Sequence, residues 1–171
     1  MQFPLFTPPT EWVMPDGYPD LSEAREVSID LETCDPNLTS RGSGWPRKDG
    51  YVIGIAVAVD GAAWYFPIRH DNGSNLDAKQ TLRWLADVCS VERDYIMHNA
   101  MYDLGWLWAE GVEVKGRILY TMIVAALLDE NRFCYALNSL GRDYLNERKS
   151  ERNLYDAVQS FGVNATRAMY K

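Results

Sequence analysis

The segment that most constrains the fold of this chain is Val27–Thr33, which reads Val-Ser-Ile-Asp-Leu-Glu-Thr. Apolar and polar residues alternate strictly in it, and a period of two is that of a β-strand with one face on a core. The pattern therefore predicts a strand near Glu26 to Glu32. Its polar face would carry two carboxylates side by side, those of Asp30 and Glu32.

A second acidic motif lies much further along the chain, in the segment His98-Asn99-Ala100-Met101-Tyr102-Asp103. It follows a short apolar strand and opens a helix, so Asp103 can supply a third carboxylate. Hard oxygen ligands of this kind suit Mg²⁺ or Mn²⁺, and pairs of such ions support phosphodiester cleavage. Each motif alone also fits a structural role, because Asp-x-Glu occurs on amphipathic edge strands and Asn and Asp are common where helices begin.

The remaining pattern indicates an α/β domain with a mixed sheet. Asp60-Gly61 is a hairpin signal between two strands, so the first three strands should form an antiparallel meander. The expected strands are Glu26 to Glu32, Tyr51 to Val59, Ala62 to Ile68, Tyr95 to Met97 and a fifth within Val112 to Leu119. The expected helices are Asp77 to Cys89, Ala100 to Glu110, a buried one at Met122 to Leu128, Ala136 to Leu145 and Glu151 to Phe161. Cys34 to Asp49 should be a loop.

Composition fits one domain of 171 residues with a substantial core. Residues 1–24 are rich in proline and read as an irregular surface arm, anchored by Phe3, Phe6 or Trp12, and residues 25–171 as the domain. There is no apolar run of membrane-spanning length and no signal-peptide pattern. Three scattered cysteines indicate reduced thiols. These features predict a cytoplasmic protein that has no membrane partner.

The formal net charge is −7, which argues against a protein that holds nucleic acid on a broad basic surface. The charge does not exclude an enzyme in which bound metal ions neutralise the phosphate locally. Binding of nucleic acid by this domain alone should still be weak, and a larger partner could supply the missing affinity.

Six segments together resemble the DEDD superfamily of 3′–5′ exonucleases, and most of all the proofreading domains of bacteriophage-type family A DNA polymerases. The resemblance covers the chain from about Val27 onward. It implies a ribonuclease H-like fold with a mixed five-stranded sheet flanked by helices. The segments that carry it are 29–33, 49–56, 65–70, 98–107, 121–132 and 136–140.

In that family two divalent metal ions, Mg²⁺ or Mn²⁺, sit across the scissile phosphate. Carried over by position, the resemblance implies that Asp30 bridges both ions. It implies that Glu32 binds the first ion and orients the terminal 3′-hydroxyl, and that Asp103 supports the second ion. These three residues are the expected catalytic and metal-binding residues.

The resemblance also implies residues that contact the substrate, which would be the 3′ end of single-stranded DNA. Thr33 could offer its backbone amide, and Asn99 could contact phosphate or brace the site, with a helix cap as its alternative role. His70 could reach the substrate from the loop after the third strand, and its alternative is a solvated loop histidine. His98 is expected to be structural.

Two departures from the family pattern matter. Tyr120 stands where the family has an acid, and no Tyr-x-x-x-Asp motif follows Asp103, so the fourth carboxylate is missing. The chain would thus lack the C-terminal element that carries this motif, and it should be weakly active or inactive alone. The alternative is a catalytically inactive exonuclease-fold protein with a binding or interaction role.

Absence of that C-terminal element would leave apolar surface on the helices expected at Met122 to Leu128 and Ala136 to Leu145. Large exposed apolar patches usually find a partner. We therefore expect this chain to bind a polymerase domain or subunit, or to form a homo-oligomer.

Overall fold

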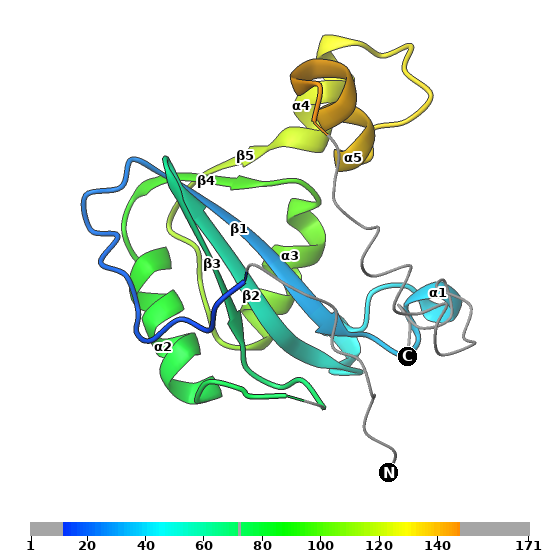
Figure 1. Cartoon of the computed structure of the whole chain (residues 1–171). Coiled ribbons are helices and arrows are strands. Elements are labelled where there is room, and N and C mark those ends of the chain that lie inside the picture. Colours follow the sequence, from blue (N-terminus) through cyan, green and yellow to red (C-terminus); the bar gives the residue numbers. More distant parts are fainter. Residues whose placement is uncertain (1–11, 72, 148–171) are drawn as a thin grey trace, which may run out of the picture.

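The computed structural model describes residues 12–71 and 73–147, and its centre is a five-stranded sheet (Figure 1). The strands are β1 (Glu26–Cys34), β2 (Tyr51–Val59), β3 (Ala62–Pro67), β4 (Arg93–Met97) and β5 (Gly116–Tyr120). Their order in the sheet is β3-β2-β1-β4-β5. The first three strands pair antiparallel, and β4 and β5 run parallel to β1. The predicted α/β class and mixed sheet are confirmed.

In the described part of the chain, seven helical segments accompany the sheet. They are α1 (Leu38–Arg41), the 3₁₀ turn η1 (Trp45–Arg47), α2 (Ala78–Cys89), α3 (Ala100–Ala109), α4 (Thr121–Leu128), α5 (Leu137–Leu140) and the π-helical turn η2 (Gly141–Leu145). Asp77 caps α2, since its carboxylate accepts a hydrogen bond from the Gln80 amide at 2.8 Å. The two short helices α1 and η1 lie inside the segment that was expected to be an irregular loop.

The alternation that predicted β1 is present in the structure. Val27, Ile29 and Leu31 are buried, and Asp30 and Glu32 on the other face are exposed. The apolar face joins one core cluster with residues from β2, β3, α2 and α3. Burying this face fixes the register of β1, because a slip of one residue would turn the carboxylates into the core.

β1 is longer than its parallel neighbour. Only Glu26–Ser28 pairs with β4, at Asp94–Ile96, whereas the antiparallel ladder with β2 continues to Cys34 with a register shift between Glu32 and Thr33. The second half of β1 therefore has no strand beside it on the β4 side. The first turn of α3 approaches β1 there.

The fifth strand lies within the expected range Val112 to Leu119 except for its last residue, Tyr120, and it begins at Gly116 because the chain turns at Gly111 and residues 112–115 return to the sheet without joining it. Two expectations for the later elements are wrong. The single helix expected at Ala136 to Leu145 is divided into α5 and η2. The helix expected to be buried, α4, has only Ala125 buried.

The exposure of α4 follows from its position. Figure 1 shows α4 and α5 beyond the end of β5, apart from α2 and from the body of the sheet. An apolar sequence is hidden only where another layer covers it, and no described layer covers α4. We call residues 121–147 the helical unit. It contains α4, the residues that connect α4 to α5, α5 and η2.

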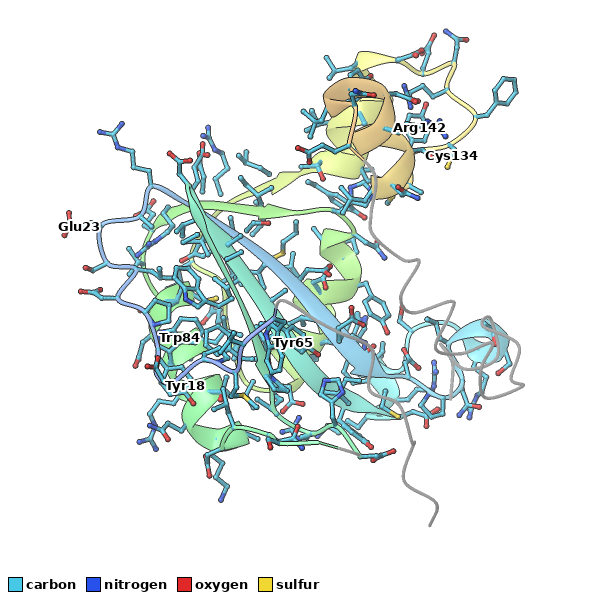
Figure 2. The ribbon with its side chains drawn as sticks, viewed as in Figure 1. Tyr18, Glu23, Tyr65, Trp84, Cys134 and Arg142 are labelled. Carbon is cyan, nitrogen blue, oxygen red and sulfur yellow. The ribbon has the colours of Figure 1, made fainter. Side chains whose placement is uncertain are left out.

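The end of the predicted arm is part of the fold. Tyr18 stacks against Phe66 and Trp84, as Figure 2 shows for Tyr18 and Trp84. The guanidinium of Arg93 donates hydrogen bonds to the backbone carbonyls of Leu21 and Ala24. These contacts attach the chain to the sheet just before β1 begins.

Trp12 packs edge-on against Tyr65 with ring centroids 6.2 Å apart. The other two expected anchors, Phe3 and Phe6, and the helix expected at Glu151 to Phe161, lie outside the described residues. Within residues 12–71 and 73–147, the helices are too short or too polar to cross a membrane.

Candidate active site

The side chain of Asp103 contacts β1 in the second half of the strand, which has no strand beside it on the β4 side. The Leu31 amide, which has no partner from β4, donates a hydrogen bond to Asp103 Oδ1 at 3.2 Å. Asp103 lies in the first turn of α3 and is 2% exposed. Because Leu31 stands between Asp30 and Glu32, this bond places the Asp103 carboxylate beside both.

The electrostatics of Asp103 reflect that position. Burial, followed by the negative charge of Asp30 and a smaller effect of Glu32, raises the pKa of Asp103 from 3.8 to about 7, against the lowering effect of the Leu31 amide. Three carboxylates at one place repel one another, and a cation between them would relieve that repulsion.

The three side chains do not form a preformed tight cage. Within the two described ranges, no three His, Cys, Asp or Glu side chains are grouped closely enough to hold a metal ion. Asp30 and Glu32 project from β1 two residues apart, on its exposed face. The donors fit Mg²⁺ or Mn²⁺ because all of them are carboxylate oxygens, while the spacing between them is that of an open cluster.

A pocket of about 1000 Å³ lies next to these carboxylates. Glu32 lines it, and so do the three residues predicted to contact substrate, Thr33, His70 and Asn99. Asp30 and Asp103 are not among the lining residues. The structure thus brings the predicted substrate contacts to one cavity, with Glu32 at its boundary with the acidic group.

Two pocket residues that sequence reasoning missed are linked to Thr33. The hydroxyls of Thr33 and Tyr102 lie 2.6 Å apart, and the Tyr102 hydroxyl is also 3.3 Å from Asp35 Oδ2. Asp35 Oδ2 accepts a hydrogen bond from the Gly44 amide at 2.9 Å. This series of hydrogen bonds connects β1, α3 and the segment that carries η1. Tyr102 could have been suspected, because it directly precedes Asp103 in the motif.

Asn99 is at the N-cap position of α3, yet its side chain makes no capping hydrogen bond. Its Oδ1 instead accepts a hydrogen bond from the Tyr120 hydroxyl at 3.2 Å. The alternative role as a helix cap is therefore wrong. Tyr120, the residue that departs from the family pattern, helps to hold Asn99 at the pocket.

The two histidines have different surroundings. His98 is structural, as expected: Nδ1 lies 2.9 Å from Thr121 Oγ1, and Nε2 lies 2.9 Å from the Tyr135 carbonyl oxygen. The carbonyl can only accept, so Nε2 carries a proton. His70 Nε2 lies 2.6 Å from the Tyr65 hydroxyl, so His70 is not a freely solvated loop residue.

Comparison with known proteins bears on the fold and on the relatives of this chain. No protein-family model matches the chain. Solved structures similar to it include Brucella melitensis NrnC with bound Mg²⁺, with a TM-score of 0.56, 18% identity and coverage of 78% of this chain and 60% of that one. NrnC bound to pGG gives a TM-score of 0.57, with 20% identity and coverage of 79% and 60%. The resemblance is confirmed at the level of fold: the chain has the ribonuclease H-like fold of the DEDD 3′–5′ exonucleases.

Its sequence relatives are phage DNA polymerases. A DNA-directed DNA polymerase of Pseudomonas phage M6 is 33% identical over 179 aligned residues, which cover 99% of this chain and 27% of the relative. The DNA polymerase DpoZ of Salmonella phage PMBT28 is 34% identical over 152 residues, covering 88% of this chain and 22% of the relative. The chain spans about a quarter of the length of these relatives.

Proposed function

We propose that this chain is the metal-dependent 3′–5′ exonuclease module of a phage-type DNA polymerase, and that it hydrolyses 3′-terminal phosphodiesters of DNA. The observation that carries the proposal is the meeting of Asp30, Glu32 and Asp103 in the second half of β1, beside a pocket. The relatives among phage DNA polymerases support DNA as the substrate and proofreading as the role.

The acidic residues would hold two divalent ions, Mg²⁺ or Mn²⁺, and the Mg²⁺ bound to the similar NrnC structure supports this choice. When bound, such ions neutralise phosphate charge and make water a better nucleophile. Asp30 lies beside Glu32 on β1 and is close enough to Asp103 to affect its charge, so we expect both ions to depend on it. Glu32, which also lines the pocket, would orient the terminal 3′-hydroxyl.

The pocket residues would then hold the terminal nucleotide. Thr33 offers its backbone amide, and its hydroxyl is fixed by Tyr102. Asn99 Oδ1 is engaged by Tyr120, which leaves its amide NH₂ to donate to a phosphate oxygen. His70 would contribute from the segment after β3. Among the described residues the candidate site has three carboxylates, so we expect weak hydrolysis by this chain alone, since losing one group of a concerted site costs several orders of magnitude.

A second candidate function is binding without turnover. It is favoured by the open spacing of the acidic residues, which in the described part of the chain do not form a compact metal-binding group. Asp143, a carboxylate further along the chain, forms ion pairs with Arg132 and Arg142 in the helical unit. On this alternative the protein holds a 3′ end or a polymerase domain without cleaving DNA.

The proposed partner is a polymerase domain or subunit. The chain matches only part of the length of its relatives, and the helical unit carries exposed apolar side chains, among them Leu127, Leu128 and Phe133. Exposed patches of this kind usually pack against another surface. A homo-oligomer is the competing arrangement, and sedimentation distinguishes the two.

The test combines metal binding and hydrolysis. A 5′-fluorescent single-stranded oligodeoxynucleotide is incubated with Mg²⁺ or Mn²⁺ and this chain, and also with the chain joined to the segment that follows the matched region in the Pseudomonas phage relative. We expect Mn²⁺ to stabilise both proteins and the longer one to shorten the oligonucleotide from its 3′ end. Asp30→Ala should abolish both effects. Metal binding and hydrolysis that are both insensitive to Asp30→Ala would overturn the proposal, and Asp30-dependent metal binding without hydrolysis in either protein would favour the binding function.

A further inference from the structure

The face of the sheet that carries the β1 carboxylates continues across β2 to a tyrosine on β3. Asp30 pairs with Ala56, and Ala56 pairs with Tyr65. Glu32 pairs with Gly54 in the same ladder. Residues paired across antiparallel strands project on the same side, so only small residues of β2 stand between Tyr65 and the two carboxylates.

Glycine at position 54 makes room for the phenol. A Cβ atom at Gly54 would overlap the Tyr65 hydroxyl oxygen, so that oxygen lies directly over the Gly54 backbone. Gly54 is in register with Glu32, which brings the hydroxyl next to that carboxylate. Burial, and then the charge of Glu32, raises the pKa of Tyr65 to about 12. A tyrosine side chain is a neutral phenol near pH 7, so the Tyr65 hydroxyl can donate a hydrogen bond.

His70 occupies the other side of this hydroxyl. Tyr65 Oη and His70 Nε2 are 2.6 Å apart, and the two rings meet edge to face with centroids 5.9 Å apart. The His70 backbone is clamped by Asn75, whose Oδ1 accepts from the His70 amide at 2.8 Å and whose Nδ2 donates to the His70 carbonyl at 2.9 Å. Both the ring and the backbone of His70 are thus held.

The residue before His70 anchors the segment to two other elements. Arg69 forms a bidentate ion pair with Glu110, at the end of α3, with N···O distances of 2.5 and 3.0 Å. It also donates to the Val52 carbonyl in β2 at 3.0 Å. A bidentate, half-buried pair holds geometry better than a surface pair does, so the position of His70 is fixed relative to β2 and α3.

We propose that Tyr65 is a positioning residue that fixes the His70 imidazole so that Nδ1 faces the pocket and donates a hydrogen bond to a phosphate oxygen of the bound nucleotide. When the Tyr65 hydroxyl donates to Nε2, the proton of the neutral imidazole sits on Nδ1. Across residues 12–71 and 73–147, Nδ1 makes no hydrogen bond. This inference rests on the proposed function and adds β3, through Tyr65, to the substrate-binding wall.

The chain suits a direct spectroscopic test, because it contains two histidines. Long-range ¹H–¹⁵N correlation spectra of the ¹⁵N-labelled chain show one set of ring signals for each histidine. We expect the His70 pattern to be that of a ring protonated at Nδ1. Titration with thymidine 5′-monophosphate and Mg²⁺ should shift the His70 signals and leave those of His98, which is bound to Thr121 and Tyr135, in place.

Three variants separate positioning from general stability. Tyr65→Phe should remove the fixed tautomer of His70 and weaken mononucleotide binding about five- to tenfold, the value of one hydrogen bond. His70→Asn, whose amide lies where Nδ1 was, should bind more tightly than His70→Gln, whose amide lies where Nε2 was. In a His70→Ala background, Tyr65→Phe should have no further effect. Thermal unfolding of each variant shows whether it is folded.

The outcomes distinguish this inference from the proposed function. If the backbone amides of β1 respond to nucleotide and Mg²⁺ while the His70 ring signals do not, the inference is wrong and the proposed function stands. If neither responds up to millimolar nucleotide, both are wrong. A ring pattern of His70 protonated at Nε2 alone, or a loss from Tyr65→Phe that persists in the His70→Ala background, would also overturn the positioning role.

Discussion

The sheet with α2 and α3 and the helical unit both contain large apolar side chains, but those side chains have opposite surroundings. In the first region, large apolar side chains such as Phe66 and Trp106 are completely buried. In the second, most of the apolar residues of α4 are exposed, and Leu127 is 82% exposed. The difference teaches that the carboxylates lie on a region whose large apolar side chains are buried within that same region. The helical unit, in contrast, has surface available for another molecule.

The sharpest way to test this contrast is to remove a large side chain from the closed core. Phe66 is 0% exposed and packs against Tyr18 and Trp84. Phe66→Ala should lower the free energy of unfolding by about 3–5 kcal/mol, measured by urea denaturation. A loss below about 1 kcal/mol would mean that the sheet region is not the stabilising part of the molecule.

A second prediction concerns Asp103, whose negative charge is unfavourable in the closed region. The pKa of Asp103 is about 7 in the fold and 3.8 for an ordinary carboxyl. The folded state thus favours the protonated form, and this contribution to stability is present below about pH 4 and is lost progressively as the pH rises to about 7.

Asp103→Asn should therefore stabilise the metal-free protein by about 1–3 kcal/mol above pH 7 and make little difference near pH 4. Denaturation in EDTA at several pH values measures this change. Mg²⁺ should stabilise the wild-type protein and have little effect on the variant. If Asp103→Asn destabilises the metal-free protein at pH 8, Asp103 is not strained by its acidic neighbours.

A third prediction concerns the joint between the two regions. His98, at the end of β4, binds Thr121 at the start of α4 and the carbonyl of Tyr135 just before α5. His98→Ala should weaken the attachment of the helical unit by about 1–2 kcal/mol, seen as faster amide hydrogen exchange in α4 and α5 with α2 unchanged. Thr121→Val, which removes one of the two bonds, should give a smaller change. Equal acceleration in α2 would show that the two regions unfold together.

The smallest effect on stability is expected at the exposed apolar surface. Leu127→Ala should change the free energy of unfolding by no more than about 0.5 kcal/mol. Leu127→Lys should reduce any self-association seen by analytical ultracentrifugation at tens of micromolar. A wild-type chain that sediments as a monomer and binds no polymerase domain would mean that this surface has no partner.

Sequence reasoning succeeded where local pattern decides structure. The bounds of β2 follow from its β-branched residues and from Asp60-Gly61, and the polar face of β1 from strict alternation. For α4 it gave two expectations, a buried helix and an exposed apolar surface, because an apolar run does not tell whether a layer will cover it; the structure has the exposed surface. In the site, Asp103 was found from its motif, whereas Tyr65 was missed because its place beside Glu32 comes from pairing across three strands.

The early end of the ladder between β1 and β4 also bears on how such a protein can change over generations. The acidic residues stand at a fork, where β1 has already parted from its neighbour, so replacing one of them breaks no ladder bond. An asparagine at position 103 could still accept the hydrogen bond from the Leu31 amide. On the proposed function, a single codon change there would abolish catalysis and leave the scaffold intact. A relative that keeps this architecture for another purpose would then be one mutation away from a catalytic form.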